Sequence, residues 1–99
     1  MGFETFELEI ERLNLKEKAI EIIKEIEYVL VKDALDNDWL VEEIMKKIIV
    51  EINRVTAGVI NYNSEYEQYM YFVNANVYCN DVTLSNRTIQ FDENGEFIE

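Results

Sequence analysis

Apolar residues recur along the chain with two different periods, which predict different local structures. Residues 6–11 alternate strictly between apolar and acidic side chains. A period of two predicts a β-strand with one buried face. Because Glu and Leu are also good helix formers, a helix that begins early in the chain is the alternative.

Two longer stretches have the spacing of amphipathic helices. Over residues 19–34 apolar side chains recur in steps of three and four, and Asn14 with Glu17 resembles a capping box before this run. The polar residues 36–38 end the run and offer the N-cap of a second helix, whose apolar stripe covers residues 40–55. Since the connection is short, the two helices are predicted to be antiparallel neighbours.

The second half of the chain is typical of β-strands. A short run at residues 59–62, a long alternating run at 69–79 and further runs at 82–84 and 88–91 are separated by polar turns. The Asn-Gly pair within residues 92–95 predicts a hairpin turn, because glycine readily adopts a positive φ angle.

Together these patterns predict a single domain spanning residues 1–99 with an α+β, two-layer fold. We expect an N-terminal strand, then two antiparallel helices that pack on an antiparallel β-meander, in the order β-α-α-β-β-β. One face of the sheet is then left wet, or free for a partner.

Charge is the outlying property of the composition. Twenty-one acidic residues oppose nine basic ones, so the formal net charge is -12. Residues 55–99 hold seven acids and a single base, Arg87. Such a field repels nucleic acid and anionic membranes and attracts basic surfaces. We therefore expect a basic protein as the partner, with no direct binding to nucleic acid and none to membranes.

The chain lacks the residues on which most catalytic sites depend. It has no histidine, one cysteine (Cys79) and three glycines in no phosphate-binding pattern. Histidine-based nucleophilic catalysis, zinc sites of Cys and His, and phosphate-cradling loops are thereby excluded. Carboxylate-only chemistry remains formally open, and a hairpin turn accounts for the oxygen-rich residues 92–96 without calcium. We predict a binding protein that is not an enzyme and holds no cofactor or metal.

The main predicted partner site lies on the C-terminal strands. In residues 69–79 one face is uniformly apolar and is predicted to be core, while the other mixes aromatic, Met and Asn side chains that suit recognition. Neighbouring carboxylates and tyrosines suit pairing with arginine. The predicted site residues are Tyr62, Glu65, Tyr66, Glu67, Phe72, Asn74, Asn76, Tyr78, Asp81, Asp92, Glu93 and Glu96.

A secondary candidate lies on the first predicted helix. Glu17, Glu21 and Glu25 are four residues apart and form one row, with side chains about 6 Å from one another. Such a row can imitate a nucleic-acid backbone toward a groove rich in Lys and Arg. A solvated helix face is the alternative interpretation.

In size, charge and composition the chain resembles the small acidic inhibitors that phages and mobile elements carry, among them nucleic-acid mimics that block CRISPR nucleases. No distinctive motif contributes to this resemblance. It implies a cytoplasmic inhibitor, in the host cell if phage-encoded, that blocks the basic groove of a nucleic-acid-binding enzyme or nuclease. An immunity protein or antitoxin that neutralises a cognate toxin is the alternative, and a self-associating assembly protein is a further one. The sequence leaves the oligomeric state open.

Overall fold

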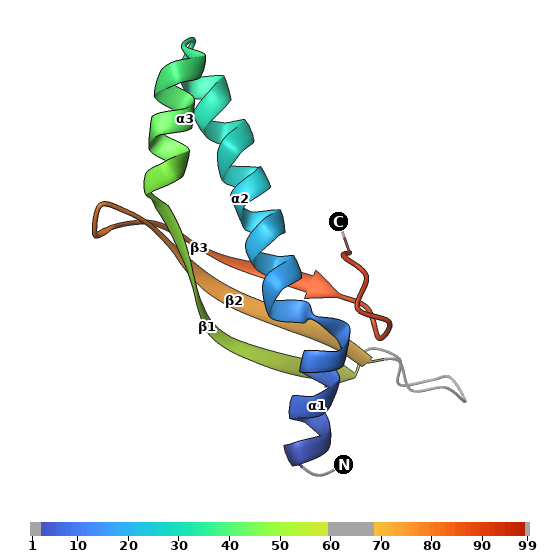
Figure 1. Ribbon diagram of the computed structural model, residues 1–99. Helices are drawn as coiled ribbons and strands as arrows, with labels where there is room; N and C mark the ends of the chain where they lie inside the picture. Colours follow the sequence, from blue (N-terminus) through green and yellow to red (C-terminus); the bar gives the residue numbers. More distant parts are fainter. Residues whose placement is uncertain (1–2, 60–68, 99) are drawn as a thin grey trace.

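The structure, a computed structural model, describes residues 3–59 and 69–98 as three helices followed by three strands (Figure 1). The strands form one antiparallel sheet in the order β1-β2-β3. The α+β class and the C-terminal meander are confirmed, but the order is α-α-α-β-β-β. The elements are α1 (Phe3–Leu13), α2 (Leu15–Ala34), α3 (Asp38–Lys47), β1 (Ile48–Val59), β2 (Tyr69–Cys79) and β3 (Val82–Phe91).

The predicted N-terminal strand is wrong, because this segment forms the helix α1. Ile10 and Leu13 lie one helical turn apart and are both buried, whereas Leu8, which a strand would place beside Ile10, is 64% exposed. Asn14 joins α1 to α2 with a left-handed backbone (φ 57°), which Asn tolerates better than most residues. It occupies the predicted N-cap position of α2, but its side chain forms no capping hydrogen bond.

The second predicted helix changes to a strand half-way along its length. Asn37 caps α3 as expected, because its side-chain oxygen accepts a hydrogen bond from the backbone nitrogen of Leu40 at 3.2 Å. The helix ends at Lys47, and the residues that follow belong to β1. Apolar residues at 48, 52 and 55 fit the helical stripe, but those at 48, 50 and 52 also alternate as in a strand. The bulge at Asn53 brings Val55 onto the same face, and the β-branched residues concentrated there favour the strand. Of the strand predicted at 59–62, only Val59 is described, as the last residue of β1.

The central strand β2 has the bounds and faces that the sequence predicts. Its described side chains alternate between buried positions at 71, 73, 75 and 77 and half-buried positions at 70, 72, 74, 76 and 78. β1 carries a bulge at Asn53 and β3 carries one at Leu84, so the two runs predicted at 82–84 and 88–91 form one continuous strand. The β2–β3 hairpin turns at Asn80 and Asp81, both with positive φ, in agreement with the predicted turn.

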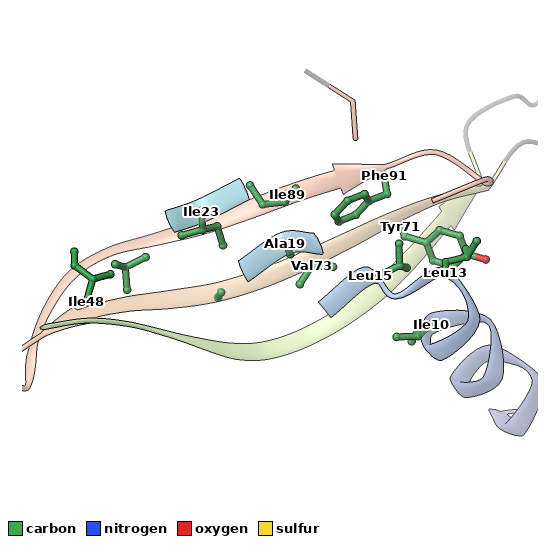
Figure 2. Packing of buried hydrophobic residues seen from close by; sticks show 12 residues of the cluster. Ile10, Leu13, Leu15, Ala19, Ile23, Ile48, Tyr71, Val73, Ile89 and Phe91 are labelled. Atoms are coloured by element: carbon green, nitrogen blue, oxygen red, sulfur yellow. The ribbon is translucent and has the colours of Figure 1, made fainter. Parts of the chain in front are cut away.

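The core lies between α2 and one face of the sheet (Figure 2). Leu15, Ala19 and Ile23 are fully buried along α2, and they face buried strand residues that include Val73 and Phe91. The far ends of α2 and α3 project past the sheet as a helical hairpin (Figure 1). Among the described residues no helix covers the opposite face of the sheet, so the fold offers two different outer surfaces: the helix layer and the uncovered sheet face.

Tyr71 gives the fold a predicted sensitivity to alkaline pH. Burial raises the pKa of its hydroxyl above 10.0, the charges of Glu9 and Glu93 raise it further, and Arg12 acts in the opposite direction. Since the folded-state pKa exceeds the unfolded value, this contribution to stability is complete below about pH 10 and is lost as the pH rises through the folded pKa. We expect Tyr71→Phe to flatten the alkaline fall of the urea midpoint, measured from about pH 9 to about pH 11. Tyr28→Phe, at an exposed tyrosine, is the control; equal alkaline slopes for both variants contradict this expectation.

Candidate partner-binding surfaces

A cluster of hydrogen-bonded asparagines occupies the middle of the uncovered sheet face. Asn74 and Asn86 form a reciprocal amide pair, with donor–acceptor distances of 2.8 and 3.2 Å. Asn53, at the bulge of β1, donates to the side-chain oxygen of Asn74 at 2.9 Å and accepts from Asn76 at 3.3 Å. Asn86 also donates to Asn76 at 2.7 Å. The four amides therefore bond one another across all three strands.

This cluster changes the interpretation of the main predicted site. Phe72, Asn74, Asn76 and Tyr78 do share the uncovered face, as predicted. However, the amides are engaged with one another, and the Tyr78 hydroxyl accepts a hydrogen bond from Asn76 at 3.1 Å. Among the described residues of this face, the charged side chains are one acid and one base, Glu51 and Arg54, which lie beside the cluster in β1. The face is polar and nearly neutral rather than anionic.

The remaining predicted site residues lie elsewhere. Asp81 is in the turn at one end of β3, whereas Asp92, Glu93 and Glu96 are in the turn at its other end. The Asp92 carboxylate is used within its own turn, where its Oδ1 accepts the backbone N–H groups of Asn94 and Glu96 at 2.9 Å each. Tyr62, Glu65, Tyr66 and Glu67 fall outside the described residues.

The turn that follows β3 packs on the junction between α1 and α2. Gly95 has φ 80°, the positive φ angle predicted for the glycine of this turn. A Cβ at this position would lie 3.0 Å from the Cβ of Leu13. Lys18 reaches across from α2, and its ammonium donates to the Gly95 carbonyl at 2.9 Å. These contacts place the carboxylates of the turn on the helix side of the molecule, away from the asparagine cluster.

Exposed carboxylates gather on this helix side. Glu17, Glu21 and Glu25 are exposed on the side of α2 that faces away from the sheet, one helical turn apart. Two glutamates of α1, Glu7 and Glu11, line a shallow hollow together with Glu17, and Glu96 lines another together with Glu21. We call this set the acidic row: Glu7, Glu11, Glu17, Glu21, Glu25 and Glu96.

The carboxylates of the acidic row have no ion-pair partner within the described part of the chain. The ion pairs formed there are Glu9–Arg12, Glu43–Lys46 and Glu27–Arg87. Lysines 16, 18 and 24 lie on the same helix and reduce the potential of the row, although the ammonium of Lys18 is already bonded to Gly95. The row is therefore a net negative surface held on a rigid helical scaffold.

Sequence reasoning missed one buried ion pair between the two layers. The Glu27 side chain is only 7% exposed, and its Oε1 accepts hydrogen bonds from Arg87 Nε at 2.9 Å and from Ser85 Oγ at 3.2 Å. Arg87, the single base of residues 55–99, thus points toward α2. The burial of Glu27 could have been predicted, since this residue continues the buried stripe of Ala19 and Ile23 at a spacing of four.

The described residues give no indication of a metal or of a membrane span. No group of three or more His, Cys, Asp or Glu side chains is placed there to hold an ion. None of the helices in this part of the chain is long and apolar enough to cross a membrane. Cys79 is a free, half-buried thiol at the end of β2. Comparison of the chain with protein-family models, with curated proteins and with solved structures finds no match.

Proposed function

We propose that this protein is an inhibitor that binds the basic nucleic-acid-binding groove of a partner enzyme, such as a nuclease, and presents the acidic row in place of nucleic acid. One observation carries the proposal: the exposed carboxylates of α1, α2 and the C-terminal turn lie side by side without ion-pair partners among the described residues. Neighbouring like charges on a helix cost a few tenths of a kcal/mol per pair, so the row does not serve folding. A basic groove relieves this repulsion on binding.

The scaffold of the row suits such a role. Glu17, Glu21 and Glu25 lie on one α-helix, so successive carboxylates rise by about 6 Å along its axis. The opposite side of this helix is anchored by fully buried residues, including Leu15 and Ile23. A partner therefore meets carboxylates whose backbone is already ordered, which lowers the entropic cost of binding. Each carboxylate can accept a bidentate hydrogen bond from an arginine.

The acidic row is better supported as the contact surface than the uncovered sheet face. The sheet face offers amides that bond one another and, among described residues, one acid and one base, Glu51 and Arg54. Among the described residues, the helix side holds more exposed carboxylates than the uncovered sheet face. We therefore assign the primary contact to Glu17, Glu21 and Glu25, together with the carboxylates beside them.

Replacing Glu17, Glu21 and Glu25 together by Gln is expected to weaken partner binding by about tenfold or more at low salt. Exposed ion pairs contribute up to about 1 kcal/mol each, and three are lost. Affinity is measured by biolayer interferometry against purified basic nucleic-acid-binding enzymes, including RNA-guided nucleases and restriction endonucleases. Inhibition of DNA cleavage is assayed with the enzymes that bind.

A matched triple variant separates the row from net charge. Asp33→Asn, Glu42→Gln and Glu51→Gln remove the same formal charge at exposed positions outside the row. We expect this variant to bind within about threefold of the unchanged protein. Equal weakening by both triples would show that only net charge matters. Binding that is insensitive to salt and is not displaced by excess DNA would contradict the groove-blocking mechanism.

A further inference from the structure

A groove separates α2 from the outer edge of β3. Two adjoining hollows of about 430 and 500 Å³ form it, and Ile26 and Phe97 line both of them. Val29 and Leu30 remain 51% and 49% exposed on its helix side. Residues 86–90 of β3 form the strand side. The apolar side chains that line this α2–β3 groove are Ile22, Ile26, Val29, Leu30, Phe97, Ile89 and Ile98.

The strand side of the groove offers unpaired main-chain groups. β3 is an edge strand of the described sheet, with β2 as its neighbouring strand. The backbone nitrogen of Ile98 donates to the carbonyl of Gln90 at 2.9 Å, so this carbonyl points away from β2. Backbone carbonyls point alternately to the two sides of a strand, so the carbonyls of Asn86 and Thr88 also point away from β2. No described backbone group bonds to them from the outer side.

The C-terminal tail already pairs with one end of this edge. Phe97 forms an antiparallel bridge with Phe91, and the two rings lie 6.4 Å apart at an angle of 57°. Residues 96–98 thereby pair with the last part of β3 and leave the edge of residues 82–89 open among the described residues. An extended segment laid along these residues continues the same edge beside the apolar stripe of α2.

We propose that the α2–β3 groove binds an extended segment of a partner protein as an additional β-strand, with apolar residues at alternate positions and an excess of Lys and Arg. Its backbone pairs with Asn86 and Thr88, and every second side chain packs against Ile26, Val29 and Leu30. Strand addition of this kind derives affinity from main-chain hydrogen bonds and specificity from pockets for alternate side chains.

Charge decides which occupant fits. Among the described lining residues Glu25 is an acid without an ion-pair partner, while the base Arg87 is already neutralised by Glu27 at 2.9 Å. The formal charge of -12 opposes approach of a second copy of this chain and favours a basic segment. The inference is independent of the proposed function, because it requires a partner that offers a strand and not one that offers a nucleic-acid-binding groove.

The probe is a set of seven-residue synthetic peptides in which Val, Ile or Leu alternates with Lys. Binding is followed by ¹H–¹⁵N NMR of the isotope-labelled protein. We expect shifts at the amides of Asn86, Thr88 and Val29, and amide hydrogen exchange at Thr88 slowed by at least about tenfold at saturation. Peptides of the same composition with the apolar residues in one block are expected to bind at least about tenfold more weakly.

Two controls test the pairing itself. N-methylation of the peptide at the positions whose N–H groups face β3 should abolish binding, whereas methylation at the alternate positions should preserve it. In the protein, Val29→Gln should lower affinity at least about tenfold, while Ile49→Gln should leave it within about twofold. Ile49 is similarly exposed, at 61% against 51% for Val29, but lies on the uncovered sheet face.

Several outcomes would overturn the proposal. Failure of every alternating peptide to perturb residues 86–90 at millimolar concentration excludes strand addition here. Equal binding of both N-methylated series shows that the main chain of the peptide is not paired. Concentration-dependent shifts of the same amides without peptide, with a dimer in sedimentation, identify a second copy of this chain as the occupant.

Discussion

Replacing Phe91 by Ala is expected to lower the free energy of unfolding by about 3–5 kcal/mol. The side chain is fully buried in β3 and belongs to the same core cluster as Leu15 and Ala19 of α2. Removing a buried ring loses its transfer free energy and leaves a cavity that rigid neighbours fill only in part. Because the total stability of a folded domain is typically about 5–15 kcal/mol, this loss is a large fraction.

Urea denaturation followed by circular dichroism measures this loss as a lower midpoint at an unchanged slope. Phe97→Ala is the matched control, because Phe97 carries the same side chain and contacts Phe91, but is 42% exposed. We expect it to cost about 1 kcal/mol or less. A Phe91→Ala loss no larger than that of the control would show that the sheet and α2 are not held together at this point.

The sequence predicts the fold well where the spacing of apolar residues fits either a strand or a helix, but not both. β2 alternates over residues 69–79 between apolar positions and positions with Asn or aromatic side chains, and its bounds and faces are as predicted. Asn80-Asp81 and the 92–95 turn are marked by residues that tolerate positive φ. These features are local, so neither the tertiary structure nor the bulges in the neighbouring strands alter them.

The sequence predicts the fold poorly where the spacing of apolar residues is compatible with both a helix and a strand. Residues 6–11 alternate like a strand, yet Ile10 and Leu13 also complete a helical stripe, and burial against the rest of the protein selects the helix. Residues 48–52 fit both a helical stripe and a strand, the bulge at Asn53 then brings Val55 onto the same strand face, and pairing with β2 selects the strand. In both cases the deciding contacts come from residues distant in the chain, which periodicity does not include.

The candidate sites depend even more on tertiary structure. The amide cluster requires the register of three strands and the bulge that brings Asn53 to Asn74 at 2.9 Å. The α2–β3 groove requires the crossing of a helix over an edge strand. Exposure of Glu17, Glu21 and Glu25 was predictable, because their spacing opposes the apolar stripe. The proximity of Glu21 to Glu96 was not predictable, because it depends on the packing of the C-terminal turn.

The buried pair of Glu27 and Arg87 carries the second large predicted effect. Arg87→Ala is expected to lower the free energy of unfolding by about 2–3 kcal/mol, because it leaves a buried carboxylate with only the Ser85 hydroxyl as partner. A fully buried pair would cost about 3–5 kcal/mol, and the value is reduced here because the Arg87 side chain is 29% exposed and so partly solvated. Lys46→Ala, which breaks the exposed pair with Glu43, should cost about 0.5 kcal/mol or less.

The double variant Glu27→Leu with Arg87→Met tests the cause of this loss. If the uncompensated carboxylate is responsible, replacing both charges by apolar side chains should restore stability to within about 1 kcal/mol of the unchanged protein. Urea midpoints of Glu27→Leu, of Arg87→Met and of the double variant then form a thermodynamic cycle, with an expected coupling of about 1–2 kcal/mol. Additive single effects would mean that α2 is held over β3 by apolar packing alone. A double variant that is less destabilised than the sum of the two single variants identifies the pair as an electrostatic link that fixes α2, and with it the acidic row and the groove, relative to β3.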